Sequence, residues 1–432
     1  MWQDQEPQRV LFMIDNKSFY ASVEAARRGM DPLAAVLVVM SEQANTNGGL
    51  ILATSPEAKR RYGLKANVSR QRDLPDDPEL CVVPPRMNLY IDYNLKINAL
   101  FQRFVAPEDL WPYSIDESLL DLTASWHLFG ADPLAVARRI QATIHDELGL
   151  RVTIGIGKNP LQAKLALDLK AKRNATLIGR LDYDTIQRDV WPISDLTSIW
   201  SIAERTAAHL NRLGLYTIDD IAHTNPYLLK AEFGLAGEQL FALAWGVDRS
   251  HLADRNRIQS PSISNSQVLP RDYRDQAEIE LVIKEIGAQV ASRLRHHHYQ
   301  TQRVSLGVGF AYADSTDGHS GFHQALTIPA TNNDHDLQTA LIRLFRAQWH
   351  GETIRNLAVG TGRLCPDSGQ QLDLLTPLAS QVHRHDLDFV LDLIRSRFGF
   401  RSLLYASSKL TGGTAIQRAS LVGGHNGGNS YA

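Results

Sequence analysis

Cysteine is scarce in this sequence: the 432 residues contain two, Cys81 and Cys365, far apart along the chain. This scarcity argues against a disulfide framework and a cysteine-rich metal site, and it is typical of a reducing compartment. Long hydrophobic runs are lacking too, since the longest, LAAVLVVM at residues 33–40, is far too short to cross a bilayer. The opening residues MWQDQEPQRV show no export signal. We therefore expect a cytoplasmic protein with no membrane contact.

An excess of charge of either sign is also absent. Lys and Arg number 45 and Asp and Glu 47, which gives a formal net charge of −2. The total charge therefore does not indicate nucleic-acid binding, although the local distribution of charge matters more. The chain is 44% hydrophobic and 21% charged, as ordinary globular proteins are. Its length allows roughly two to four domains.

Hydrophobic patterning predicts alternating strands and helices over the first 180 residues. The expected strands are 9–14, 34–40, 49–55 and 151–157, and the expected helices are 15–28, 87–104, 133–148 and 160–172. A further helix should begin at Pro56, because Ser55 is a suitable cap and proline favours the first helical position. Residues 181–253 are mostly helical, the polar stretch 255–266 is a linker, and the pattern beyond it predicts a separate α+β domain.

Two adjacent carboxylates, Asp116 and Glu117, interrupt the apolar run PYSIDESLLDL at residues 112–122. Burying them unpaired is costly, and their like charges repel each other. Divalent cations neutralise such a pair, Mg²⁺ prefers oxygen ligands, and two-metal sites hold their cations about 3.5–4 Å apart. Asp15, at the end of an apolar strand, is a candidate third ligand, and the main-chain carbonyl of Asn16 a candidate fourth. Since neighbouring strand residues point to opposite faces, we expect the chain to turn here so that both acids reach one cluster.

The spacing of the acids leaves a second interpretation open, in which Asp116 and Glu117 lie at an exposed hairpin tip and Asp15 caps a helix. Basic residues favour the metal site. Residues 151–180 contain seven Lys or Arg, among them Lys164, and a single acid, and the segment EAKRRYG adds Lys59. Each basic segment alone is typical of a solvated surface. Together with the acids they supply what a metal-bound triphosphate needs, because phosphoryl transfer depends on positioning and charge neutralisation.

Three segments, taken together, resemble the catalytic segments of the Y-family DNA polymerases in order and spacing. They are LFMIDNKSFYASVE, YSIDESLLDL and TIGIGKNPLQAKLALDLKAK. Within that family of translesion enzymes, the sequence most resembles the UmuC-like branch of Gram-positive bacteria and their mobile elements. The resemblance implies an α+β right-hand polymerase fold and template-directed, error-prone translesion DNA synthesis in DNA damage repair and the SOS response. The reaction it implies is nucleotidyl transfer from a dNTP to a primer 3′-hydroxyl, with two Mg²⁺ ions as cofactors.

The resemblance also assigns roles to individual residues. It implies that Asp15, Asp116 and Glu117 are the catalytic, metal-binding acids, and that Asn16 adds its main-chain carbonyl. Tyr20 falls on the steric-gate position, where an aromatic ring excludes a ribose 2′-hydroxyl. The triphosphate-binding residues it implies are Phe19, Ser55, Lys59 and Lys164. Without the resemblance, the aromatic pair at 19–20 would be interpreted as core.

The implied domains follow the parts of a hand. The palm would comprise residues 1–19 and 85–180, the fingers 20–84, the helix–hairpin–helix-like thumb 181–253, a linker 254–263, the little finger 264–365, and a C-terminal tail 366–432. The thumb hairpin of the family normally carries glycines whose backbone N–H groups approach a DNA phosphate. Here residues 198–201 read Ser-Ile-Trp-Ser. In the little finger, Arg293, Arg295 and Arg303 are candidate contacts to the DNA backbone.

A short segment in the expected tail suggests a protein partner. QQLDLL, residues 370–375, resembles the sliding-clamp-binding peptide of bacterial polymerases, with Gln371, Leu372, Leu374 and Leu375 as anchors. The alternative is that this segment packs on its own domain. The expected partners are therefore primer–template DNA, a dNTP and the bacterial sliding clamp. The sequence leaves open whether a RecA-type protein or an accessory mutagenesis subunit is a further partner.

Two other functions remain open from the sequence. The same acids could serve a two-metal nuclease or a nucleotide cyclase, although Tyr20 beside the basic residues argues against hydrolysis. Alternatively, the chain is a non-enzymatic DNA- or clamp-binding accessory whose site has decayed, although all three acids are intact. A primer-extension assay separates these functions from DNA synthesis.

Overall fold

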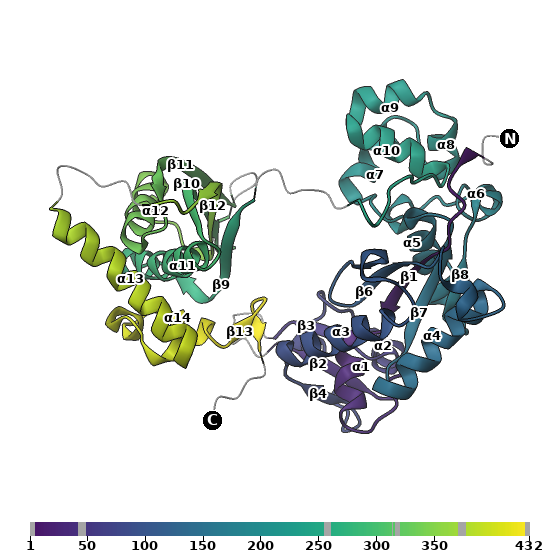
Figure 1. Ribbon diagram of the computed structural model, residues 1–432, viewed down its shortest axis with the longest axis horizontal. Helices are drawn as coiled ribbons and strands as arrows, with labels where there is room; N and C mark the ends of the chain where they lie inside the picture. The colour runs from purple at the N-terminus through teal and green to yellow at the C-terminus, as the bar shows by residue number, and fades with distance from the viewer. Residues whose placement is uncertain are drawn as a thin grey trace. The chain divides into compact units, whose positions relative to one another are not determined.

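The computed structural model describes residues 5–41, 49–254, 261–312, 314–315, 320–369 and 377–427. The chain divides into two compact units, drawn in Figure 1. The first comprises Met1–Met40 and Ile51–Asn256, and the second Ser41–Leu50 and Arg257–Ala432. Within the described residues, no helix has both the length and the apolar character needed to span a membrane.

A five-stranded sheet forms the centre of the first unit, in the order β5-β6-β1-β7-β8 (Figure 1). Its strands are Leu110–Pro112 (β5), Glu117–Asp121 (β6), Leu11–Asn16 (β1), Val152–Gly157 (β7) and Ile178–Arg180 (β8). The central strand β1 pairs antiparallel with both β6 and β7. Because it has a neighbour on each side and is covered on both faces, its apolar run is buried.

Helices cover both faces of this sheet. Helix α5 (Pro160–Leu169) packs on the face that carries Leu11, Met13 and Leu119. The other helices of this part are α3 (Met87–Phe101) and α4 (Pro133–Leu148), the latter with the bounds predicted from the sequence. Asp132 caps α4, since its side chain accepts a hydrogen bond from the amide of Ala135.

A smaller three-stranded sheet, in the order β3-β2-β4, lies beside the first. Its strands are Ile51–Thr54 (β3), Leu37–Met40 (β2) and Cys81–Val83 (β4), and its helices are α1 (Phe19–Ala26) and α2 (Pro56–Tyr62). Helix α2 begins as the sequence predicts: Ser55 accepts a hydrogen bond from the amide of Ala58, and proline occupies the first position. The core between the small sheet and α2 includes Val38 and Leu64.

Short helices form the remainder of the first unit. They are α6 (Tyr183–Asp189), α7 (Glu204–Arg212), α8 (Ile218–His223), α9 (Pro226–Phe233) and α10 (Leu235–Ala244). Just before α7, Ser201 has a φ of 73°, a left-handed conformation that glycine adopts far more readily. The backbone of this hairpin therefore keeps a glycine-like shape, although serine occupies the position.

In the second unit, an antiparallel four-stranded sheet runs in the order β11-β10-β12-β9. The strands are Ile263–Tyr273 (β9), Tyr299–Phe310 (β10), Gly321–Thr331 (β11) and Ile354–Pro366 (β12). Helices α11 (Gln276–His296) and α12 (Asp334–Gln348) bury one face, where Val304, Leu306 and Val308 meet their apolar side chains. The opposite face of β10 carries Arg303 and Ser305.

The described part of the expected C-terminal tail has ordered secondary structure that the sequence analysis does not predict. It contains α13 (Leu378–Phe398), α14 (Ala415–Arg418), β13 (Leu421–Val422) and β14 (His425–Asn426). Arg418 ties it to the second unit by donating hydrogen bonds to Gln267 and Gln289, at 2.7 and 2.9 Å. Glu285 of α11 accepts hydrogen bonds from the amides of Thr414 and Ala415, both at 2.9 Å.

Candidate active site

The three acids predicted to form the site come from β1 (Asp15), from the turn before β6 (Asp116) and from the first residue of β6 (Glu117). Asp15 and Glu117 are direct partners across the antiparallel strands, so their side chains lie on the same face of the sheet. The carbonyl of Asp116 accepts hydrogen bonds from the amide and the side-chain nitrogen of Asn16, at 2.9 and 3.0 Å. These bonds hold the turn against the end of β1. The structure therefore brings all three acids to one place.

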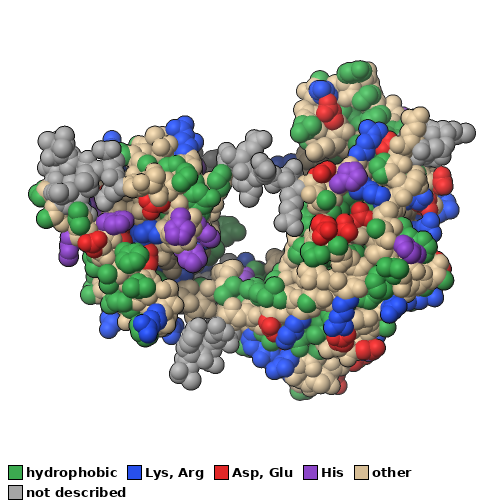
Figure 2. All heavy atoms as spheres, in the orientation of Figure 1, with side chains coloured by type: hydrophobic (Ala, Val, Ile, Leu, Met, Phe, Trp, Pro, Cys, Tyr) green, Lys and Arg blue, Asp and Glu red, His purple; other side chains and the backbone are tan. Residues whose placement is uncertain are grey.

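A tight turn at Ser114 allows the two adjacent acids to leave the strand in different directions. The Ser114 hydroxyl donates to Asp116 Oδ1 at 2.7 Å and accepts from the amide of Glu117 at 3.0 Å. The amides of Tyr113 and Ser114 both donate to the carbonyl of Glu117. This is the bend that two neighbouring acids need to reach one cluster. In Figure 2, acidic side chains gather on the visible face of the first unit near β6.

Two lysines face these acids. Lys164 Nζ lies 2.7 Å from Glu117 Oε1, and Lys172 Nζ lies 3.5 Å from Asp15 Oδ2. Asp168 lies between the lysines and pairs with each, at 3.3 and 2.8 Å. Lys172 and Asp168 are not among the site residues predicted from the sequence. Their spacing is the signal that could have found them, since residues 164, 168 and 172 recur every four positions along one helical face.

Glycines of β7 explain how α5 delivers Lys164 to the acids. A Cβ at Gly155 would lie 2.2 Å from the carbonyl oxygen of Ala163, and one at Gly157 would lie 2.2 Å from the Ala163 amide nitrogen. Any side chain here would therefore force the helix away from the strand. The two glycines let α5 lie directly on β7. The closest contact is at Ala163, the residue before Lys164.

The electrostatics of the site disfavour the ionised form of Asp15. Burial raises the pKa of Asp15 to about 6; Lys172 opposes this, and the charges of Asp116 and Glu117 reinforce it. Burial alone would lower the pKa of Lys172, but Asp15, Asp168 and Glu117 raise it overall. Within the described residues, no three His, Cys, Asp or Glu side chains have the geometry of a preformed metal site. Lysine ammonium groups here supply the cationic partners of the acids.

Tyr20, the expected gate, is held in a stack of aromatic rings. Its ring lies 4.4 Å from that of Tyr90 at an interplanar angle of 13°. The Tyr90 hydroxyl donates to the fully buried Glu24 at 2.9 Å, and Arg86 donates two hydrogen bonds to the same carboxylate, at 2.9 and 2.6 Å. Burial and the charge of Asp116 raise the pKa of Tyr20. The sequence analysis does not find this support for the ring, because it comes from a third segment, α3.

The expected triphosphate-binding residues divide into available and unavailable groups. Lys59 is exposed on α2. The side chain of Phe19 is buried, but Phe19 begins α1, where a helix leaves its first backbone amides without intrahelical partners. Ser55 is fully buried, so the expectation of a phosphate contact by its side chain is wrong. Its hydroxyl donates to the carbonyl of Ala35 at 2.6 Å and accepts from two amides.

Lys17 adds a cation that the sequence analysis overlooks. Burial lowers the pKa of Lys17, Asp15 raises it, and the charges of Lys59 and Lys172 lower it further. Lys17 therefore belongs to the same cluster of cations. Its place directly after β1 was available from the sequence, but nothing in the pattern distinguished it from a surface lysine.

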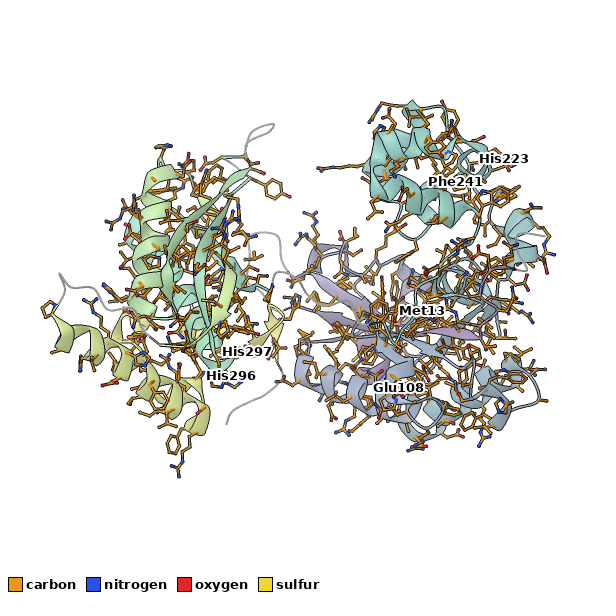
Figure 3. All side chains as sticks on the ribbon, turned by 45° about the horizontal axis from the view of Figure 1, so that its top comes forward. Met13, Glu108, His223, Phe241, His296 and His297 are labelled. Carbon is orange, nitrogen blue, oxygen red and sulfur yellow. The ribbon has the colours of Figure 1, made fainter. Side chains whose placement is uncertain are left out.

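A cleft of about 730 Å³ opens next to Lys164 in the first unit. Its walls include Trp111 and Tyr113 of the β5–β6 hairpin and Trp200 of the hairpin before α7. All three aromatic side chains are substantially exposed. Met13, which Figure 3 labels on β1, also lines the cleft. The cleft thus runs from Lys164 toward the hairpin that resembles a helix–hairpin–helix element.

The expected contacts in the second unit differ in outcome. Arg295 is a wrong assignment as a DNA contact, because its buried guanidinium pairs with Asp392 at 2.6 Å and with Asp334 at 2.9 Å. Arg293 donates to the carbonyl of Ser264 at 2.9 Å, and Arg303 is exposed. The expected clamp-binding residues Gln371, Leu372, Leu374 and Leu375 lie outside the described residues.

Comparison with known proteins identifies the family. The sequence matches the impB/mucB/samB family over residues 14–168 and the C-terminal domain of that family over residues 260–374. The first match contains all three acids and Lys164. This chain belongs to the impB/mucB/samB family. It is a UmuC-like member of the Y-family translesion polymerases, as its catalytic segments imply.

Relatives of this family match nearly the whole chain. The "Putative UV-damage repair protein UvrX" of Bacillus subtilis (strain 168) is 37% identical over 422 residues, which cover 98% of each chain. "DNA polymerase IV 2" of the same organism is 34% identical over 97% of this chain and 99% of its own length. Membership of this family makes the chain a DNA-directed DNA polymerase.

A solved structure agrees with the fold. The "Y-family DNA polymerase chimera Dbh-Dpo4(243-245)-Dbh" superposes with a TM-score of 0.66 and covers 83% of this chain and 99% of its own. At 20% sequence identity this likeness shows the fold alone. It confirms the α+β right-hand polymerase architecture expected from the sequence.

Proposed function

We propose that this polymerase joins a dNTP to a primer 3′-hydroxyl at the site formed by Asp15, Asp116 and Glu117. The observation that carries the proposal is the pairing of Asp15 with Glu117 across β1 and β6, with Lys164 Nζ only 2.7 Å from Glu117. Acidic residues and a lysine suited to bind a triphosphate, although distant in sequence, therefore lie together on one face of the central sheet. A surface hairpin would not need this convergence.

The donor set suits Mg²⁺. Three carboxylates and the main-chain carbonyl of Asn16 offer the hard oxygen ligands that this cation prefers. Burial raises the pKa of Asp15, and the charges of Asp116 and Glu117 raise it further, so a divalent cation bound here would stabilise the ionised carboxylate. When bound, two Mg²⁺ ions would neutralise the triphosphate and favour attack by the primer hydroxyl. We assign Asp15, Asp116, Glu117 and the Asn16 carbonyl as their ligands.

The surrounding residues of the chain would hold the nucleotide. Lys164 would exchange its partner Glu117 for a phosphate oxygen, and Lys59 would approach the triphosphate from α2. The first amides of α1, at Phe19 and Tyr20, point a helix N-terminus at the same region, which favours an anion. The Tyr20 ring, fixed by its stack, would leave no space for a ribose 2′-hydroxyl.

Primer–template DNA would lie along two surfaces, one in each unit. In the first unit, the cleft beside Lys164 is lined by exposed aromatic rings. In the second, the uncovered sheet face presents small side chains, with Ser305 opposite Gly360, Gly307 opposite Ala358 and Arg303 alongside. Small residues allow a sugar–phosphate backbone to approach closely, and arginine supplies charge.

Error-prone bypass of damaged templates, in an SOS response, follows from the family and fits the size of the small sheet. That sheet has three strands and is flanked by α1 and α2, of eight and seven residues. Such short elements enclose a nascent base pair loosely. The sliding clamp and a RecA-type or accessory mutagenesis subunit stay predictions from the sequence.

Primer extension tests the proposal. The double change Asp116→Ala and Glu117→Ala should reduce dNTP incorporation by roughly 10³-fold or more, because it removes the charges that stabilise the transition state. The dissociation constant for a labelled primer–template, measured by fluorescence anisotropy, should change less than about threefold. Asp121→Ala is the matched control, since it removes a carboxylate from the other end of β6.

Two results would contradict the proposal. Extension by the double variant at the wild-type rate would remove the acids from the catalytic role. Primer shortening in place of extension by the wild-type protein would favour the two-metal nuclease instead.

A further inference from the structure

Helix α13 presents a continuous apolar face to solvent and buries acidic side chains on its other side, unlike an ordinary surface helix. On the outer side, Val382, Phe389, Val390 and Leu393 are 44%, 63%, 45% and 56% exposed. On the inner side, Asp388 is 4% exposed and Leu391 is 6% exposed. These apolar residues recur at helical spacing, so they form one continuous face, here called the α13 face.

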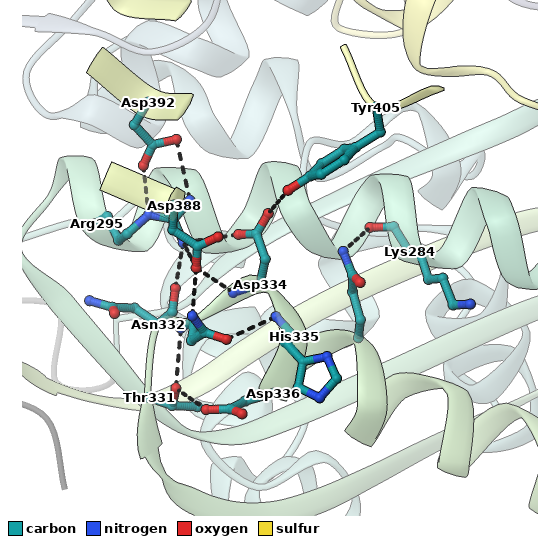
Figure 4. A network of polar contacts seen from close by, with 12 residues as sticks. Lys284, Arg295, Thr331, Asn332, Asp334, His335, Asp336, Asp388, Asp392 and Tyr405 are labelled. Atoms are coloured by element: carbon teal, nitrogen blue, oxygen red, sulfur yellow. Dashed lines mark hydrogen bonds and ion pairs between the residues drawn. The ribbon is translucent and has the colours of Figure 1, made fainter. Parts of the chain in front are cut away.

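Buried ionic contacts hold α13 in this orientation, as Figure 4 shows. Arg295 of α11 pairs with Asp392 at 2.6 Å, and Asp388 accepts hydrogen bonds from Asn333 and from the amide of Asp334, at 2.7 and 3.0 Å. Rotating the helix to bury its apolar face would strand these charges without partners. The α13 face is therefore fixed outward before any partner arrives.

The charges at the ends of the α13 face are complementary to each other. Asp386 and Arg397 both lie in the apolar stripe and are exposed. They are eleven residues apart, about 16 Å along a helix, so they cannot pair within one chain. In two antiparallel copies related by a two-fold axis between Leu391 and Asp392, however, each Asp386 lies level with Arg397 of the other helix, and Val390 lies level with Leu393.

We propose that two copies of this polymerase associate through the α13 face in this antiparallel register. A second copy fits the face better than an unrelated occupant because one stretch supplies both the apolar centre and the oppositely charged ends, as an isologous interface requires. The half-exposed apolar side chains would bury about 400 Å² on each copy. That is below the ~800 Å² per partner of a standard stable interface. The expected dimer therefore forms reversibly at micromolar protein concentration.

The helix lies on the side of the second unit that α11 and α12 cover, through its contacts to Arg295 and Asp334. The uncovered face of the four-stranded sheet is on the other side of those helices. Pairing through α13 would thus leave that sheet face accessible. The inference goes beyond the proposed chemistry, because the acidic site takes no part in it.

Sedimentation velocity of the full chain from 1 to 50 µM tests the association. The weight-average sedimentation coefficient of the wild type should rise with concentration from the monomer to the dimer value. Leu393→Glu should keep the protein monomeric across this range, because it places a carboxylate in the apolar centre. Leu410→Glu is the matched control: Leu410 is 64% exposed but lies outside α13, so this variant should dimerise like the wild type.

A charge exchange tests the register. Asp386→Arg and Arg397→Asp, each alone, should raise the dissociation constant at least tenfold, because each places like charges level with one another. The double variant should recover the wild-type constant to within about threefold. Primer extension by all variants should stay unchanged at concentrations where the wild type is monomeric, which separates this inference from the proposed function.

Three results would overturn the proposal. The first is a wild type that remains monomeric at 50 µM. The second is a dimer that Leu393→Glu leaves intact or that Leu410→Glu breaks equally. The third is a double charge variant that dimerises no better than the single ones, which would indicate another occupant or another register.

Discussion

Replacing Gly155 by alanine should move α5 off the central sheet and thereby disturb the active site. The added Cβ would lie 2.2 Å from the carbonyl oxygen of Ala163 and 2.3 Å from the amide nitrogen of Leu167. Carbon atoms rarely approach such groups closer than 3.0 Å. Both obstacles are helix backbone, which cannot rotate away as a side chain could, so α5 itself must shift by roughly 1 Å.

The shift has a cost in stability and a larger one in activity. Overpacking of this kind destabilises a protein by about 1–3 kcal/mol. Lys164 directly follows Ala163, so its ammonium would move with the helix, and a misplacement of about 1 Å can reduce a reaction rate by about 10²-fold. We expect Gly155→Ala to lower kcat/KM for dNTP incorporation by 30-fold or more, as an order of magnitude.

Single-nucleotide incorporation at 20 °C measures this, with urea unfolding to establish that the variant is folded. Gly287→Ala is the matched control: this glycine lies in α11 of the second unit, and a Cβ there would meet only side-chain atoms, the nearest being the end of Leu341 at 3.0 Å, so the change should leave activity within about twofold. A folded Gly155→Ala variant with the wild-type kcat/KM would refute the reasoning, because it would mean that the position of α5 does not set the position of a catalytic group.

Three further outcomes are expected. Tyr20→Ala should raise ribonucleotide incorporation at least tenfold in a primer-extension assay, and Tyr90→Leu should raise it less, because it loosens the stack without removing the gate. Tyr227→Ala is the control, because Tyr227 is 79% exposed. An unchanged preference for deoxynucleotides in Tyr20→Ala would exclude the gate role. Arg295→Met should lower the unfolding free energy of the second unit by about 3–5 kcal/mol, because it leaves several buried carboxylates unpaired. Urea unfolding measures this change, and a decrease below about 1 kcal/mol would contradict the expectation. Burial raises the pKa of Asp388 to about 6 from 3.8, and the nearby Asp334 reinforces this, so its contribution to stability is largest below pH 4 and is lost as pH rises through 6. The difference in unfolding free energy between wild type and Asp388→Asn should therefore vary between pH 4.5 and 7, and a constant difference would show that Asp388 does not titrate there.

Local signals in the sequence were sufficient for many elements of the fold. The bounds of α4 follow from a proline at the first position, Asp132 as cap and Gly149 in a left-handed conformation at the end. Alternation along β1 places Leu11, Met13 and Asp15 on one face, and the register with β6 adds Glu117. These are short-range patterns, and so they can be read without knowledge of the fold.

Long-range packing decided the residues that the sequence analysis missed or misassigned. The cap chemistry of Ser55 was correctly predicted, yet its hydroxyl is consumed by that cap and by Ala35, and no pattern in the sequence shows this. Arg295 looked like a surface arginine until α13 brought acids to it. Lys172 became a site residue because the helical turn after α5 continues its face.

The sequence analysis predicts a C-terminal tail where the structure has an ordered helix, α13. Helix α13 buries the carboxylate of Asp388 and exposes Leu393, although it buries Leu391, so its hydrophobic pattern does not reveal which side packs on the second unit. Only the partners of Asp388 and Asp392, on distant helices, determine its orientation. Sequence patterns based on hydrophobic burial cannot anticipate a helix held by buried ions.

Anomalous scattering from Mn²⁺ measures the central claim most directly, in crystals of the protein with primer–template DNA and a non-hydrolysable dNTP. The account predicts manganese peaks bound by Asp15, Asp116 and Glu117, with the triphosphate against Lys164. Ordered DNA and nucleotide with manganese bound elsewhere, or with Lys164 still paired to Glu117, would contradict it.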